Sequence, residues 1–207
     1  MEFSSEADIP HPPLPAELPV MVLPDCHLFP GCLLPLYIFE ERYCEMLAHA
    51  LNTDRMFCIG NREGGGEDCS ISPYSTAGLV RVCVKQEEGT SHLLLLGIER
   101  IRLKGWTQLT PFRIAEVEAI TTVISDAEKI SSLRLKALEL FADGGISEYG
   151  KQLREALSCN ENAELVCDVL SYHFTRCPKL QQKLLGEESL ERRYEMLIEA
   201  LERAKCK

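Results

Sequence analysis

The chain has 207 residues, of which 45% are hydrophobic and 26% charged, so it is long enough for one large or two small folded domains. Its net charge of −10 argues against nucleic acid as a partner, because binding to a phosphate backbone needs clustered Lys and Arg, and against an anionic membrane surface. No apolar run reaches the length of a membrane span, and the acidic, proline-rich start does not resemble a signal peptide. We therefore expect a cytoplasmic protein in which the ten cysteines are free thiols.

The chain opens with a stretch, residues 1–17, that contains four prolines and no apolar periodicity, which predicts a flexible leader. A short strand is expected at 19–23 and a second at 32–39, after the turn signal Pro30-Gly31. The proline inside the second strand, Pro35, lacks an N–H group, so this strand should lie at a sheet edge or carry a bulge. The period then changes to that of a helix, whose apolar face would hold Tyr43, Leu47, Ala50 and Leu51.

Five further strands are predicted from alternating or continuous apolar residues. They cover 55–60, 76–86, 92–97, 99–103 and 112–120, with a glycine-rich surface loop at 61–75 and a hairpin turn at 87–90. In the second of them, Val80, Val82 and Val84 should share one face. The third is almost entirely apolar, so burial on both faces is expected. Because neighbours in sequence would pair, the predicted sheet is an antiparallel meander.

A helical period begins at Ser125, where Ser-Asp-Ala-Glu over 125–128 matches a capping box. This first helix should end at Gly144-Gly145. Other helices are predicted over 147–157, 161–174, 178–185 and 189–205. The last of these would bury Leu190, Tyr194, Leu197, Ile198 and Leu201 and pair Glu199 with Arg203 on its outer side. The sequence thus predicts a β-rich subdomain over 18–124 and a helical subdomain over 125–207, which would share a core.

The first strands and helix resemble the opening of the Lon protease N-terminal substrate-binding domain. That family has a Leu-Pro strand, then Phe-Pro-Gly, then Pro-Leu-x-Ile-Phe-Glu-x-Arg-Tyr. The matching residues are Leu18, Pro19, Phe29, Pro30, Gly31, Pro35, Leu36, Ile38, Phe39, Glu40, Arg42 and Tyr43. Weaker similarity continues through GLVRV, LLLLGIERIRL, PFRIAEVEA and LQQKLLGEESLERRYEMLIEALE. The resemblance implies an α+β fold: a small antiparallel PUA-like β-barrel with one inserted helix, followed by a C-terminal helical bundle.

The resemblance also suggests where a peptide would bind, although most matching residues are apolar, Pro or Gly and are typical of a folding signature. The candidate peptide-binding residues are Phe39, Glu40, Arg42, Tyr43 and Trp106. Glu40, Arg42 and Tyr43 would form the polar rim of a groove between barrel and helix. The structural alternative is a carboxylate at the helix start, an arginine partner for it and a core tyrosine. Trp106, the only tryptophan, is either a binding anchor or a core residue.

No motif in the sequence indicates catalysis, a cofactor or a metal site. The cysteines form no C-x-x-C pair, and neither G-x-S-x-G nor H-E-x-x-H occurs. Residues 145–152 resemble a phosphate-binding loop, but Gln152 stands where Ser or Thr would ligate magnesium, and a helix precedes the segment. The ATPase and Ser-Lys peptidase domains of full-length Lon are therefore not expected. The sequence indicates a stand-alone Lon-domain protein, or a fragment, that is not an enzyme.

The resemblance implies a non-catalytic module that binds exposed apolar segments of unfolded or tagged polypeptides. Hydrophobic docking into a groove would provide the binding, and the edge strand with Pro35 offers a place for β-augmentation. A second hypothesis is an interaction scaffold that holds one folded partner, the use to which cereblon puts its Lon-like domain. A third, an enzyme or ligand-binding barrel, would need an enclosed pocket with convergent polar groups. The sequence assigns no oligomeric state.

Overall fold

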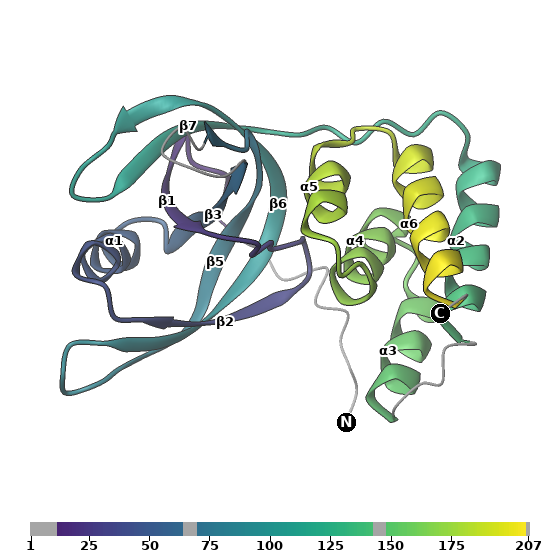
Figure 1. Ribbon diagram of the computed structural model, residues 1–207, viewed down its shortest axis with the longest axis horizontal. Helices are drawn as coiled ribbons and strands as arrows, with labels where there is room; N and C mark the ends of the chain where they lie inside the picture. The colour runs from purple at the N-terminus through teal and green to yellow at the C-terminus, as the bar shows by residue number, and fades with distance from the viewer. Residues whose placement is uncertain (1–11, 64–69, 143–147, 206–207) are drawn as a thin grey trace. The chain divides into compact units, whose positions relative to one another are not determined.

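The computed structural model describes residues 12–63, 70–142 and 148–205 (Figure 1). These residues contain seven strands and six helices in two compact units, one ending at Ile120 and the other beginning at Thr121. The predicted α+β class is confirmed. Most of the predicted leader, the centre of the loop at 61–75 and the helix-ending Gly144-Gly145 lie outside the described residues.

The first unit contains all seven strands and one helix, α1, inserted between the second and third strands as expected. The strands are β1 (Glu17–Leu23), β2 (Leu33–Ile38), β3 (Met56–Glu63), β4 (Ser70–Ile71), β5 (Tyr74–Lys85), β6 (Ser91–Gln108) and β7 (Arg113–Ala119), and the helix is α1 (Glu41–Asn52). Strands β3 and β4 shorten the predicted loop at 61–75 from both sides.

Strand β6 is the centre of the sheet, because it pairs with β5, with β7 and, over its first part, with β2. Strand β5 pairs with β3, and β1 pairs with both β3 and β7, so the pairings lead from β1 back to β1. All pairs are antiparallel except β1–β3, which is parallel. The purely antiparallel meander is therefore wrong at β1, and a PUA-like barrel stays a prediction beyond these pairings.

Strand β6 corrects two further expectations. The predicted strands at 92–97 and 99–103 are one continuous strand of 18 residues. Its apolar start is not buried on both faces: Leu93 and Leu95 are buried in the core, whereas His92 between β5 and β2 is exposed. The side chains of this run that point away from the core are part of an apolar surface. This is why the run is apolar on both sides.

A β-bulge at Arg81 changes the side-chain alternation of β5. Val80 pairs with Leu95 but Val82 already pairs with Leu94, so Arg81 is left without a place in the ladder. The predicted common face of the three valines is therefore wrong. Val80 is buried, whereas Val82 and Val84 beyond the bulge are exposed on the opposite face.

Two clusters of buried side chains lie on the two faces of the strands. One packs α1 against the sheet, with Tyr43, Met46, Leu47 and Ala50 of the helix meeting buried side chains such as Phe57. Fully burying an aliphatic or aromatic side chain contributes about 1.5–3 kcal/mol, so this helix face is a major source of stability. The other cluster comprises Leu18, Val20, Met56, Cys58, Ala77, Leu79, Ile101 and Ala115.

The Phe-Pro-Gly turn is fixed onto β6 by backbone contacts. Gly31, with φ of 74°, donates its N–H to the carbonyl of Gly97 at 2.9 Å, and Gly97 donates to Cys32 at 2.9 Å. The ring of Phe29 is fully buried. A glycine suits position 31 because a side chain is disfavoured at positive φ. This part of the signature therefore serves the fold.

The second unit contains five helices, close to the predicted spans. They are α2 (Ala127–Ala142), α3 (Glu148–Cys159), α4 (Ala163–Phe174), α5 (Pro178–Gly186) and α6 (Leu190–Lys205). The five residues expected to face inward on α6 are all buried, and Glu199 pairs with Arg203 at 2.6 Å. A buried ion pair joins α6 to α4, between Arg193 and Asp168.

The start of α2 differs from the predicted capping box by one residue. Asp126, not Ser125, is the cap: its carboxylate accepts hydrogen bonds from the backbone N–H groups of Glu128 and Lys129, both at 3.0 Å. The N–H groups of Ser125 and Asp126 instead donate to the carboxylate of Glu191, at 3.0 and 2.9 Å. This contact across 65 residues has no local sequence signal, which explains the shift.

Candidate functional site

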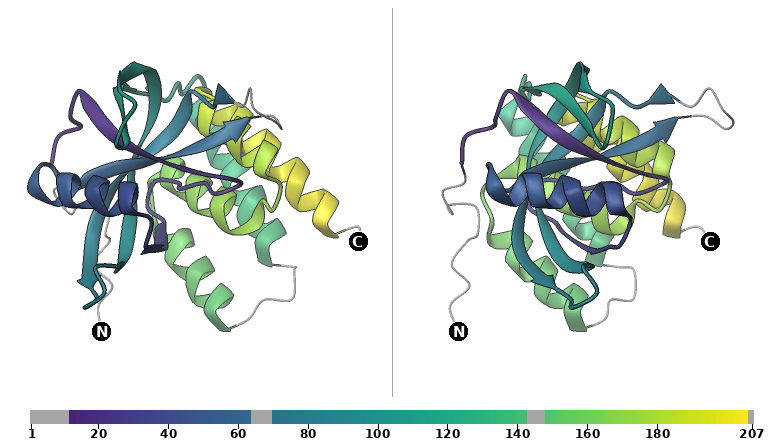
Figure 2. Two further views of the ribbon diagram at one scale, coloured as in Figure 1. Left: turned by 60° about the vertical axis from the view of Figure 1, so that its left-hand side comes forward. Right: turned by 90° about the vertical axis from the view of Figure 1, so that its left-hand side faces the viewer.

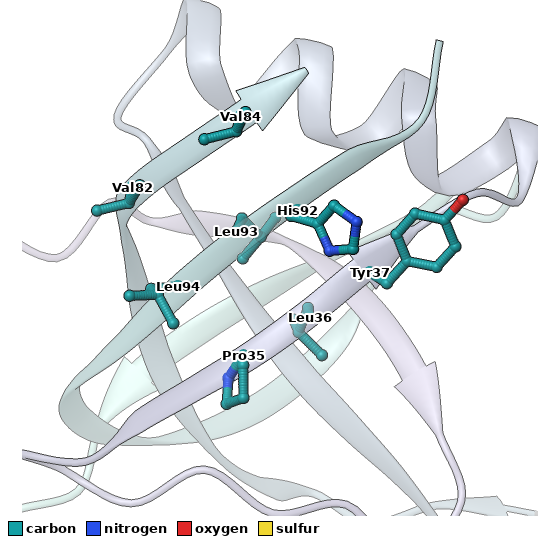
Figure 3. Close-up of a pocket in the computed structure, with 8 residues that line it drawn as sticks. All are labelled: Pro35, Leu36, Tyr37, Val82, Val84, His92, Leu93 and Leu94. Atoms are coloured by element: carbon teal, nitrogen blue, oxygen red, sulfur yellow. The ribbon is translucent and has the colours of Figure 1, made fainter. Parts of the chain in front are cut away.

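An apolar surface covers the outer side of three neighbouring strands in the first unit (Figure 3). Its side chains come from β2, from the start of β6 and from the end of β5. We call it the outer apolar face and define it as Pro35, Tyr37, Val82, Val84, His92 and Leu94. With Leu36 and Leu93 these residues line an open groove of about 360 Å³.

The strand register places these side chains in two rows. Pro35 lies opposite Leu94, which lies opposite Val82. In the next row Tyr37 lies opposite His92, which lies opposite Val84. Residues directly opposite on one face are close enough for their side chains to touch. The bulge at Arg81 is the reason that both valines join these rows instead of entering the core.

Three rings form a stacked series at one end of the outer apolar face. The rings of Tyr37 and His92 have centroids 4.6 Å apart with 27° between their planes. The rings of Tyr37 and Phe39 are 5.6 Å apart with 26° between planes. Phe39 is 63% exposed and Tyr37 49%, so both rings keep a face for a partner. Stacked rings hold one another in place and lose little freedom when a partner arrives.

The outer apolar face has few ionisable side chains. Its residues include no carboxylate, ammonium or guanidinium, and His92 is its one ionisable imidazole. Binding would come from removing apolar surface from water, worth roughly 25 cal/mol per Å². Among the described residues no group of three or more His, Cys, Asp or Glu side chains is arranged to hold a metal ion.

Comparisons with known proteins place this chain in a family. The model of the ATP-dependent protease La (LON) substrate-binding domain matches residues 17–203. The chain belongs to this family.

Solved structures with the same fold include two other LON domains. The N-terminal domain of Mycobacterium avium complex Lon protease has a TM-score of 0.72 at 16% identity, and the match covers 90% of this chain and 98% of that one. The Lon N-terminal domain protein from Xanthomonas campestris has a TM-score of 0.63 at 21% identity, with 88% and 96% covered. At these identities the similarity shows the fold alone.

Curated relatives are whole Lon proteases, of which this LON domain matches a part. Lon protease of Desulfosudis oleivorans is 30% identical over 121 residues, which are 56% of this chain and 14% of that protein. Lon protease 2 of Desulfotalea psychrophila is 27% identical over 190 residues, 88% of this chain and 24% of that protein. The LON domain thus spans a quarter or less of the length of these relatives. No helix in the described part of the chain is long and apolar enough to cross a membrane.

Among the candidate residues, Glu40 and Arg42 form an exposed ion pair at the start of α1. Nη2 of Arg42 lies 2.6 Å from Oε2 of Glu40, and its guanidinium stacks over the ring of Tyr43, 4.5 Å from the centroid. Tyr43 is buried, and its hydroxyl donates to the carbonyl of Val22 at 3.0 Å and accepts from the Val22 N–H at 3.2 Å. This is the arrangement of the structural alternative for these three residues, and it anchors α1 on β1.

Phe39 and Trp106 are both exposed but lie in different places. Phe39 stacks on Tyr37, at the end of β2 that pairs with the start of β6. Trp106 is 40% exposed and lies fourteen residues after His92 on β6, with Arg113 5.4 Å from its ring. The hairpins at the two ends of β6 lie on opposite sides of α1 (Figures 1 and 2). The LON domain therefore brings Phe39, but not Trp106, to the outer apolar face.

The residues predicted from the sequence did not include Tyr37, Val82, Val84 and His92. One signal for Tyr37 was present: with Pro35 it shares the side of β2 opposite to the core-facing Ile38. The two valines could not be placed, because the position of a bulge depends on pairing with another strand.

Proposed function

We propose that this LON domain is a non-catalytic module that binds exposed apolar segments of unfolded polypeptides on its outer apolar face. The observation that supports this most is the exposure of Tyr37, Val82 and Val84 on this face, at 49%, 48% and 53%, and of Phe39 stacked beside Tyr37, at 63%. Large apolar side chains gathered on one face commonly mark an interaction site. The family name, substrate-binding domain, points to the same class of partner.

The proposed affinity is modest. Burial of three or four side chains contributes about 1.5–3 kcal/mol of binding free energy each. Against this stands the free-energy cost of the freedom of motion that is lost on association, about 4–15 kcal/mol. At the favourable end these numbers leave about 8 kcal/mol, a dissociation constant of roughly 1 µM, so we expect binding of this affinity or weaker, down to the 100 µM, or about −5.5 kcal/mol, that the experiment covers. Such affinity suits a surface that takes up many different segments and releases them.

The experiment is fluorescence anisotropy with a labelled, permanently unfolded polypeptide and, as the control, a labelled folded protein. We expect saturable binding of the unfolded chain and none of the folded control. No binding of the unfolded chain at 100 µM would reject the proposal. Capture of one folded protein instead would favour the scaffold hypothesis, in which the same surface holds a single partner.

A further inference from the structure

We infer that the bound segment joins the sheet as an additional strand beside β2, and that it is uncharged with apolar side chains at every second position. This rests on the proposed function, because it specifies how the same surface takes up a polypeptide. The edge of β2 that faces away from β6 neighbours the outer apolar face.

Along Pro35 and Tyr37, β2 has a second edge on which no described strand lies. Among the described strands β2 pairs only with β6. Gly97 donates its N–H to the carbonyl of Cys32, so this carbonyl points toward β6, although the N–H of Cys32 donates to Phe29 within the turn. Hydrogen-bonded and non-hydrogen-bonded pairs alternate in an antiparallel ladder, so Pro35 and Tyr37 fall in non-hydrogen-bonded pairs. Their backbone polar groups therefore point away from β6, toward this second edge.

Pro35 fits this geometry. A proline facing β6 would remove a ladder hydrogen bond, whereas at an outward-facing position it costs none. The second edge consequently offers the carbonyl of Pro35 and both the N–H and the carbonyl of Tyr37. An incoming extended backbone satisfies these groups, whereas a helix, whose own backbone groups are already paired, does not.

The side chains of such a strand would alternate in direction, as those of β2 do. Every second one would lie beside Pro35 and Tyr37 and extend the outer apolar face. A charged side chain at these positions would lose hydration without meeting an opposite charge, since the face carries none. An uncharged segment with branched or aromatic residues at alternate positions is the partner that fits.

The test uses three labelled octapeptides of the same alternating sequence with the purified 207-residue chain. One is unmodified, and the other two are N-methylated on the amides of one edge or the other. We expect the unmodified peptide to bind and only one methylated peptide to bind at least tenfold more weakly. The edge that matters also distinguishes antiparallel from parallel pairing, because the amides facing β2 differ between the two. Equal binding of all three would overturn the inference.

A pair of variants tests the protein side of the same contact. Tyr37→Ala removes the ring and keeps the backbone N–H, whereas Tyr37→Pro removes both. We expect Tyr37→Pro to bind the peptide at least threefold more weakly than Tyr37→Ala, with equal melting temperatures. If the two variants bind alike, the edge is not used. If the protein without substitutions does not bind the unfolded polypeptide, the proposed function itself is rejected. If it binds, but neither N-methylation of the peptide nor Tyr37→Pro weakens binding, only the added strand is rejected.

Discussion

Gly97 lies so close to Phe29 that a Cβ on the glycine would be 2.1 Å from the Phe29 carbonyl oxygen and 2.7 Å from its carbon. Both contacts are with backbone, which cannot rotate away. We expect Gly97→Ala to lower the free energy of unfolding by at least about 2 kcal/mol, because the turn that carries Phe29 would have to leave β6. Urea unfolding followed by circular dichroism measures this loss.

Gly105 on the same strand is the matched control. A Cβ there meets nothing within 4 Å, and its φ is not in the left-handed region. Gly105→Ala should therefore leave the unfolding midpoint within about 0.5 kcal/mol of the unchanged chain. Equal stability of the two alanine variants would show that the Phe-Pro-Gly turn is not held against β6.

The contact of Glu191 with the start of α2 predicts acid sensitivity of the second unit. Backbone N–H groups, its own among them, lower the pKa of this carboxyl below its ordinary value of 4.5. A folded-state pKa below the unfolded one means that the contribution is present above about pH 4.5 and is lost as the pH falls through the folded value. Glu191→Gln should therefore destabilise the chain by about 1–3 kcal/mol at pH 7 and by less at pH 4.

Urea unfolding of this variant and the unchanged chain at both pH values provides the measurement. Glu199→Gln is the control, since Glu199 belongs to an exposed pair with Arg203 that contributes little. A Glu191→Gln penalty of equal size at both pH values would contradict the contact.

Cysteine reactivity gives an independent check of the core. Burial raises the pKa of the Cys58 thiol to about 12, and its side chain is fully buried. Cys159 and Cys177 are exposed. Because the thiolate is the nucleophile, iodoacetamide at pH 8 should modify Cys159 and Cys177 before Cys58, which should react only after unfolding. Peptide mass spectrometry over time follows this order, and early labelling of Cys58 would contradict the packing of β3.

Local patterns predicted most elements of this fold. Apolar periodicity located every helix described to within about two residues, and the Pro30-Gly31 signal located the turn. The features that were missed depend on contacts distant in sequence. The parallel pairing of β1 with β3, the bulge at Arg81 and the bond from Asp126 to Glu191 each join segments with no local sign of their partner.

In the candidate site, too, local contacts were predictable from the sequence and distant contacts were not. Glu40 and Arg42 are two residues apart in the sequence, so the sequence could suggest their contact. Whether Trp106 lies near Phe39 depends on the length and course of β6, which sequence reasoning divided into two strands. Tyr37 was within reach, but Val82 and Val84 face outward only because of the bulge.

The most direct test of the outer apolar face compares two aspartate variants. Val84→Asp places a carboxylate on the face, and Leu109→Asp makes the same change in charge at a residue of the same unit that is 61% exposed and lies after β6. Anisotropy titrations with the labelled unfolded polypeptide measure both. We expect Val84→Asp to weaken binding at least tenfold, or about 1.4 kcal/mol, and Leu109→Asp to change it less than twofold. Equal affinities of the two variants would show that polypeptides do not bind on this face.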